Sequence, residues 1–218
     1  MDRFLDAPLV VFRIGTIPIS ETVLISWIIM GVMVGGGYIL TRRLRRRPTG
    51  VQSVLELLVN GLTSLVSMTM GRDKLGFLGY VGALVLFILV SNILGVTGLR
   101  PPTSDINVTM ALALLTFLAT QYYRFHARGF GGYVKSFAEP VAFIFPLNVI
   151  SELAAPVSLG MRLFGNILGG SVIVAMIYSV VPLVIPLPFH LYFDLFVGVV
   201  QTYIFAMLTM VFVKMALE

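Results

Sequence analysis

PVSLGMRLFGNILGGSVIVAMIYSVV, residues 156–181, decides the fold class, because it sets one arginine inside a long apolar run of helical character. Apolar residues continue for several turns after Arg162. An arginine stays protonated, so it cannot avoid the cost of burial by losing its charge. At the centre of a bilayer that cost is about 2.5 to 3.5 kcal/mol on insertion scales. Such a residue is by default a functional site, and a side chain reaching the membrane surface from a helix end is the alternative.

The composition around this stretch is that of a membrane protein. Of the 218 residues, 58% are hydrophobic and 11% are charged, whereas a soluble domain has roughly 25% charged residues. The long unbroken apolar runs favour helices over the short alternating segments of a membrane barrel. We therefore expect an all-α membrane protein that forms a single integral membrane domain, residues 1–218.

The apolar runs predict five transmembrane helices and one interfacial amphipathic helix. The last two helices are expected to be long and steeply tilted. Residues 141–180 would measure roughly 60 Å as one helix, against a hydrocarbon core of about 30 Å, so this segment is either a tilted helix or a hairpin. The segment 124–139 is predicted to be a loop. The expected spans are 22–41, 76–98, 108–123, 141–180 and 187–214, and the interfacial helix is 51–71.

Basic residues predict the orientation in the membrane. Arg42, Arg43, Arg45, Arg46 and Arg47 directly follow the first span, and the side of the membrane richer in Lys and Arg is usually cytoplasmic. Counting the other loops gives an N-terminus outside and a C-terminus in the cytoplasm. We interpret the cluster as a topology signal and expect no nucleic-acid partner. The first residues do not resemble a signal peptide.

Several chemistries find no support in the sequence. There is no cysteine, and His126 and His190 lack the spacing of metal ligands. No phosphate-binding loop, Ser/His/Asp set or paired-carboxylate site is visible. We therefore expect no bound metal, no cofactor and no bond-making chemistry in this chain.

A polar stripe is predicted on the helix that carries Arg162. Ser158 and Asn166 lie one turn before and after the arginine, and Ser151 lies three turns before it on the same face. Gly165 and Gly169 remove side-chain bulk beside the arginine. These features are typical either of ordinary small-residue helix packing or of a groove where another helix passes close to the charge.

A second stripe is predicted on the final helix, where His190, Asp194, Gly198 and Gln201 follow one another at helical spacing. An aspartate in an apolar helix is costly, and a histidine one turn away can share a proton with it. A static pair near the outer surface is the alternative.

Three further polar positions stay open between two roles. Asn148 and Glu152 add polarity at the start of the long helix, where Glu152 could simply be an interfacial residue. Asp105, together with Asn107, could cap the helix that follows it, which is a common role for both residue types.

Three motifs in the same order resemble subunit a of F-type ATP synthases. The most specific is PVSLGMRLFGN (156–166), and PTSDINVTMALAL (102–114) and QTYIFAMLT (201–209) support it. The resemblance runs from about residue 15 to the end of the chain. It implies a proton-conducting stator subunit that forms two half-channels against a rotating ring, with one arginine separating them. Proton flow would thereby be coupled to ATP synthesis on other subunits.

The resemblance also implies roles for individual residues and partners. Arg162 would face the carboxylate of each passing ring helix, and an opposite charge favours the ionised form of such a carboxylate. Gln201 matches a glutamine that packs against the arginine, and Asn166 a polar residue one turn further on. Ser151 matches a residue of the cytoplasmic half-channel, and Asp105 an acid near the external opening. The implied partners are a ring of subunit c, the peripheral stalk subunit b and the bilayer of a bacterial inner membrane.

The sequence departs from the family pattern at the residues that relay the proton. Many bacterial members have glutamate and histidine where this chain has Ser171 and Asp194, although mitochondrial members also place an acid on the last helix. We expect ions to enter near Asp105, His190, Asp194 and Ser171, and to leave past Ser151, Asn148 and Glu152. The relaying residue and the choice between proton and sodium stay open. A secondary ion transporter with a midplane site and a purely structural anchor are the alternatives, although the chain lacks the internal repeat that such transporters usually show.

Overall fold

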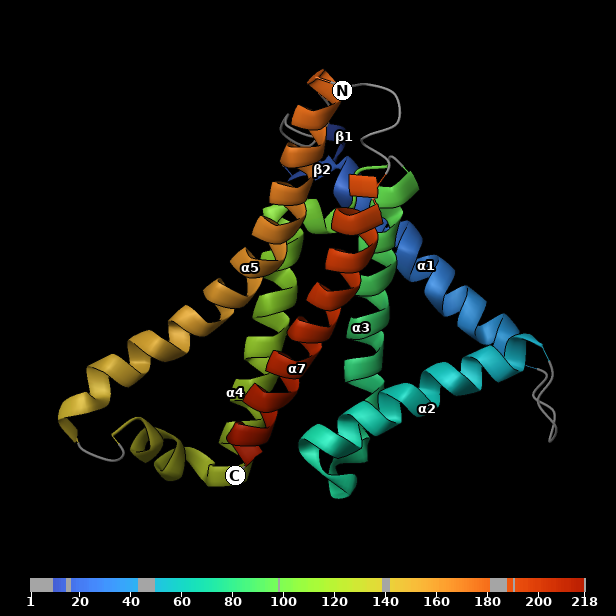
Figure 1. Cartoon of the computed structure of the whole chain (residues 1–218). Coiled ribbons are helices and arrows are strands. Elements are labelled where there is room, and N and C mark those ends of the chain that lie inside the picture. The colour runs from blue at the N-terminus through green and yellow to red at the C-terminus, as the bar shows by residue number, and fades with distance from the viewer. Residues whose placement is uncertain are drawn as a thin grey trace.

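The computed structural model describes residues 10–14, 17–42, 50–97, 99–138, 142–180, 188–189 and 191–217. Within these residues the chain is a bundle of long helices, which confirms the prediction of an all-α membrane protein (Figure 1). A short antiparallel hairpin, β1 (Val10–Ile14) and β2 (Ile17–Ser20), precedes the first helix and was not expected. The arginines at 43 and 45–47 and His190 lie outside the described residues.

Six helical segments are long and apolar enough to cross a membrane. A 3-10 turn leads into α3 and another extends it, and a π-helical stretch leads into α7. The helices are α1 (Glu21–Thr41), α2 (Val51–Met70), α3 (Leu78–Ile93), α4 (Ile106–Ala138), α5 (Phe145–Val180) and α7 (Gly198–Leu217).

The six candidates include α2, which the sequence predicts to lie at the interface. Length and composition alone do not separate the two placements. In Figure 1, α2 runs across the lower end of α3 instead of alongside α3 and α4, and half of its residues are exposed. The interfacial placement stays a prediction, and the direction of α2 supports it.

The predicted loop at 124–139 is wrong, because α4 continues to Ala138. The helix changes direction at Gly129, whose φ of 65° and ψ of 175° are not helical. Glycine reaches positive φ without a Cβ clash, so it is suited to such a break. Three glycines in this segment obscured a helix that resumes after the break and lies below the start of α5 (Figure 1).

One continuous helix, α5, fills the long segment that the sequence left open between a helix and a hairpin. Its 36 residues contain Pro156 and measure about 54 Å at the usual helical rise. It runs obliquely to α3 and α4 (Figure 1), as expected for a helix longer than the hydrocarbon core.

Two apolar clusters form the core, and α7 contributes to both. One joins α3, α4 and α5 to α7 around Ile88, Leu163 and Phe205. The other joins α2 and α3 to α7 around Val66 and Met210. Since α7 lies between the other helices, the positions of its polar residues are set from several sides.

Two glycines on α5 differ sharply in their surroundings. A Cβ on Gly160 would lie 2.6 Å from the sulfur of Met110 and 3.3 Å from the Cβ of Ala113 on α4, so this glycine permits close packing of the two helices. A Cβ on Gly165 would meet nothing within 4 Å. Only the first glycine serves a helix contact within the described chain.

We predict that Gly160→Val destabilises the detergent-solubilised protein by about 1 to 3 kcal/mol, because the added methyl groups overpack the α4–α5 contact. Gly165→Val is the matched control, since it carries the same intrinsic helix cost but meets open space. Thermal unfolding followed by circular dichroism should show a lower midpoint for the first variant only. Equal midpoints would contradict the packing described for Gly160.

Candidate functional site

Arg162 lies at the midpoint of α5, on a face that no other part of the described chain covers. Its side chain is exposed. The two ion pairs among the described residues, Lys74–Asp73 and Arg124–Glu152, do not include it, and it has no hydrogen-bond partner there. The midpoint of a helix about 54 Å long does not fit a side chain anchored near a helix end. The structure therefore places a cation halfway along a membrane helix, with no compensating charge among the described residues.

The face around Arg162 consists of small and polar residues. Ser158, Gly165 and Asn166 are exposed and Gly169 is half-buried. A Cβ on Gly165 or Gly169 would meet nothing within 4 Å. The opposite side of α5 is the packed one, with Leu159, Leu163 and Ile167 buried. The helical spacing predicted from the sequence thus separates a core-facing side of α5 from an open side.

Gln201 and Asn166 connect the arginine face to α7. The Nδ2 of Asn166 donates a hydrogen bond to the Oε1 of Gln201 at 2.6 Å. Gln201 is almost fully buried, whereas Asn166 is exposed. The glutamine therefore contacts the asparagine one turn from Arg162, and the packing of Gln201 against the arginine itself, which the resemblance implies, stays a prediction.

Asp194 lies on the π-helical stretch Leu191–Val197, half-buried against the end of α3. A Cβ on Gly95 would lie 3.4 Å from the Cγ of Asp194, and one on Gly198 would lie 3.0 Å from the Cβ of Asn92. Asp194 and Gly198 therefore share the side that faces α3, while Gln201 reaches α5. His190 lies outside the described residues, so the single four-residue stripe predicted for this helix is described only in part.

The amide of Asn92 fixes the beginning of α7. Its Nδ2 donates to the carbonyl of Gly198 at 3.0 Å and to the hydroxyl of Thr202 at 3.2 Å, and its Oδ1 accepts from Thr103 at 2.7 Å. All four residues are buried. Sequence reasoning did not single out Asn92, although a lone amide inside an apolar run is a usable signal because lipid offers it no partner.

Ser171 is half-buried, and its hydroxyl turns back to its own helix. It donates to the carbonyls of Ile167 at 2.8 Å and Leu168 at 3.1 Å. The neighbouring Gly170 packs against Phe193, with a would-be Cβ at 3.1 Å from the Cβ of Phe193. This contact brings the part of α5 that carries Ser171 beside the stretch that carries Asp194.

Asp105 is buried and caps α4. Its Oδ1 accepts from the backbone N–H of Asn107 at 2.9 Å, which is the usual N-cap hydrogen bond. Its Oδ2 accepts from the hydroxyl of Thr22 on α1 at 2.5 Å. The structure thus shows the capping role that the sequence left open, and the role at an external opening stays a prediction.

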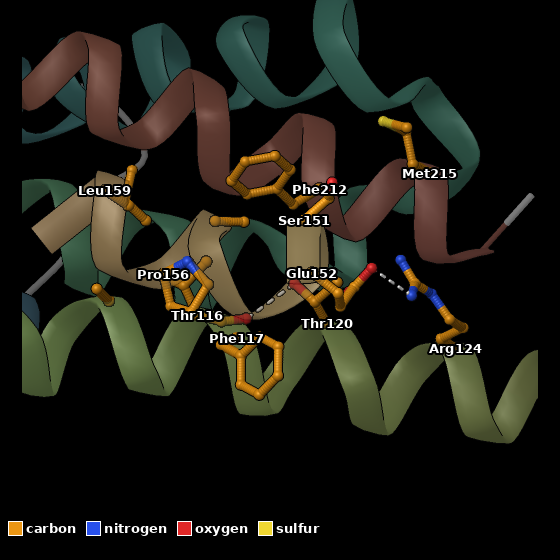
Figure 2. Close-up of a pocket in the computed structure, with 12 residues that line it drawn as sticks. Thr116, Phe117, Thr120, Arg124, Ser151, Glu152, Pro156, Leu159, Phe212 and Met215 are labelled. Carbon is orange, nitrogen blue, oxygen red and sulfur yellow. Dashed lines mark hydrogen bonds and ion pairs between the residues drawn. The ribbon is translucent and has the colours of Figure 1, made fainter. Parts of the chain in front are cut away.

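At the opposite end of the bundle, α4, α5 and α7 enclose a cavity of about 180 Å³. Figure 2 shows Ser151 and Glu152 at this cavity, with Phe212 and Met215 of α7 across from them. Asn148 is half-buried nearby in sequence, and its Nδ2 donates to the carbonyl of Phe137 at 2.9 Å. Two of the three residues predicted for the cytoplasmic exit therefore line one cavity.

Glu152 is held by residues that sequence reasoning missed. Its Oε2 lies 2.8 Å from Nη1 of Arg124, and its Oε1 accepts from Nε2 of Gln121 at 2.7 Å. Arg124 was placed in a predicted loop, so its position on α4 facing α5 was not foreseen.

The two groups of polar residues lie on opposite sides of Arg162 along α5, with Ser171 beyond it and Ser151 and Glu152 before it. No cluster of three or more metal-ligating side chains occurs among the described residues. This arrangement suits the passage of ions along polar side chains, interrupted at one fixed positive charge.

Comparisons of the sequence with family models and with known proteins agree on one family. The sequence model of the family described as ATP synthase A chain matches residues 23–214. ATP synthase subunit a of Moorella thermoacetica is 36% identical over 207 residues, covering 94% of each chain. ATP synthase subunit a 2 of Bradyrhizobium sp. (strain BTAi1) is 37% identical over 206 residues, covering 94% of this chain and 92% of the relative. A protein of Propionigenium modestum named "ATP synthase subunit a, sodium ion specific" is 36% identical over 213 residues, covering 90% of this chain and 74% of the relative.

The match spans nearly all of the chain and agrees with six helices long and apolar enough to cross a membrane. The chain therefore belongs to the ATP synthase A chain family, the multi-pass, ion-translocating stator subunits of the membrane sector of ATP synthases.

Proposed function

We propose that this chain conducts protons through two half-channels that meet a rotating ring of subunit c, and that Arg162 separates them. Proton flow past the ring would drive rotation and thereby ATP synthesis. The bond-making chemistry would lie on other subunits, in keeping with the absence of a catalytic motif in the sequence. The rest of the complex, including the peripheral stalk subunit b, would hold this chain still against the ring.

The observation that carries the proposal is the charge of Arg162 at the midpoint of α5, which no described residue of the chain compensates. A guanidinium facing lipid at that depth is unfavourable by several kcal/mol, and it cannot become neutral. A carboxylate on a partner helix would compensate it. The open face beside Gly165 and Gly169 lets such a helix approach closely.

A charge of this kind also acts as a barrier. A ring carboxylate beside Arg162 is favoured in its ionised form, since an opposite charge nearby lowers the pKa of an acid. The ring site must therefore release its proton as it passes the arginine. A fixed cation repels a proton that would cross directly from one half-channel to the other.

The polar residues on either side of Arg162 would line the two half-channels. Ions would enter past Asp105, His190, Asp194 and Ser171. The described contacts that bring Phe193 to Gly170 and Asp194 to Gly95 support a common outer region. Ions would leave past Ser151, Asn148 and Glu152, two of which line the cavity of Figure 2.

The orientation is proposed from the basic residues, with the N-terminus outside and the C-terminus in the cytoplasm of a bacterium whose inner membrane holds the complex. The start of α3 and the end of α7 lie at one end of the bundle (Figure 1). Arg72 and Lys74 belong to the 3-10 turn that leads into α3, and Lys214 belongs to the last turn of α7. The hairpin β1–β2 lies at the other end. This asymmetry agrees with a cytoplasmic lower end.

We predict that Arg162→Ala abolishes coupled ATP synthesis in membrane vesicles, reducing it to the level of vesicles without the chain. The ring carboxylate would lose its counter-charge, and protons could pass between the half-channels without turning the ring. ATP formation driven by an imposed proton gradient measures the effect. Arg128→Ala is the matched control, since it removes an exposed arginine of α4 and should leave synthesis unchanged. Retained coupling in the Arg162 variant would exclude the proposed role.

A second prediction concerns the outer half-channel. Asp194→Asn should slow passive proton flux through the membrane sector roughly 100-fold, a modest loss for a positioned proton-transferring side chain. The amide keeps the size of the carboxylate but cannot carry the proton, so assembly should be preserved. Flux is measured by a pH-sensitive dye in vesicles stripped of the catalytic sector, and Asp194→Glu should retain much of it. An unchanged rate in the Asn variant would remove Asp194 from the path.

A third prediction concerns the ion, because the relative from Propionigenium modestum carries a sodium-specific name. ATP-driven pumping by vesicles containing this chain should acidify the interior in sodium-free buffer, and added sodium ions should not raise the rate. The pH-sensitive dye measures acidification, and tracer sodium measures any sodium uptake. Sodium uptake that depends on ATP would show that the conducted ion is not the proton.

A further inference from the structure

An ion pair lies among the residues that line the cavity between α4, α5 and α7. Nη1 of Arg124 lies 2.8 Å from Oε2 of Glu152, and Figure 2 shows the two side chains reaching toward each other from α4 and α5. The side chains are 16% and 23% exposed. A pair so largely withdrawn from solvent has a well-defined geometry, and losing one partner leaves the other charge poorly solvated.

Further contacts hold both partners in place. Gln121, one turn before Arg124 on α4, donates to Oε1 of Glu152 at 2.7 Å, and its own Oε1 accepts from the hydroxyl of Tyr133 at 3.0 Å. The guanidinium carbon of Arg124 lies 5.9 Å from the ring centre of Phe137, within range of a cation–π contact. The carboxylate of Glu152 is therefore oriented by α4 and by the helix segment after the Gly129 break.

The backbone beside the cavity has one carbonyl without its usual helical partner. Pro156 has no N–H, so the carbonyl of Glu152, four residues earlier, lacks its usual helical donor. The cavity also contains Thr116, Thr120 and Ser151. A cation moving through this space meets oxygen atoms that attract it, and the Glu152 carboxylate is the most strongly attracting of them.

We propose that Arg124 is a positioning residue of the cytoplasmic half-channel, which compensates Glu152 so that the carboxylate guides leaving ions without retaining them. The inference rests on the proposed function. Conduction requires sites that bind an ion well enough to admit it and weakly enough to release it. Paired with Arg124, the carboxylate supplies polar oxygen atoms at the mouth of the cavity with little net charge. Without the arginine, it becomes a trap for the cation that must leave.

The test is a double-mutant cycle on passive proton flux, measured in vesicles stripped of the catalytic sector and containing the full membrane complex. Arg124→Gln should lower the flux about tenfold, which corresponds to 1.4 kcal/mol in the barrier. Glu152→Gln alone should have a smaller effect. The double variant should recover most of the flux, because no uncompensated carboxylate remains. Arg124→Lys, which keeps the charge, should also retain most of it.

Arg128→Gln is the matched control, because it removes a charge one turn further along α4 from a side chain that is exposed and has no partner among the described residues. Its flux should equal that of the unmodified chain. A double variant as slow as Arg124→Gln would overturn the inference, as would an unchanged flux in Arg124→Gln.

Two further measurements distinguish a failure of this inference from an assembly defect and from a failure of the proposed function. If Arg124→Gln alone does not accumulate in the membrane, recovery of both amount and flux in the double variant supports the inference. A double variant that accumulates without flux, or does not accumulate, overturns it. Unmodified vesicles that conduct no protons would instead refute the proposed function itself.

Discussion

The structure depends on one constraint. A charge that cannot be neutralised lies halfway along a helix that is long enough to cross a membrane. Arg162 is paired with nothing in the described chain, and the surface beside it is free of bulky side chains at Gly165 and Gly169. An isolated chain in lipid would leave this cation unfavourably placed. In the proposed function an acidic partner compensates the arginine, and the glycines provide the space for its approach. The proposal thus links the stability of this chain in the membrane and its function in the complex to one residue.

The position of α7 determines which polar side chains lie near Arg162. Apolar clusters hold this helix from the side of α2, α3, α4 and α5. The buried amide of Asn92 binds the Gly198 carbonyl and the Thr202 hydroxyl near the start of the helix. Gln201 follows directly and reaches Asn166. Because these hydrogen bonds form where lipid offers no alternative partners, they fix the rotation of α7 better than apolar packing alone would.

The sequence predicts the faces of the long helices well, because a regular helix converts spacing directly into direction. Arg162, Asn166 and Ser158 indeed share the open side of α5. Spacing is less informative where the backbone is irregular. The π-helical stretch at Leu191–Val197 changes the angle between Asp194 and the residues after it. The glycines near 129–132 resemble a loop although only Gly129 leaves the helical region, so Arg124 was not connected with Glu152. Nor does a glycine in a sequence reveal its neighbours, which is why Gly160 and Gly165 could not be told apart.

Two arginines on neighbouring helices, Arg124 and Arg162, differ in how their positive charge is compensated. Arg124 has its acid within the chain, four residues before Pro156 on α5, and the ion pair compensates its charge. A compensated pair can border a path for ions because its net field is small. Arg162, ten residues further along α5 than Glu152, has no acidic partner among the described residues. In the proposed motor that acid arrives on each passing ring helix and leaves again, so the compensation of Arg162 is renewed at every step of rotation. An internal partner for Arg162 would satisfy the charge permanently and remove the reason for the ring carboxylate to ionise. The proposed mechanism therefore requires that Arg162 has no permanent acidic partner, as is the case within the part of the chain that the structure describes, whereas it requires one at Arg124.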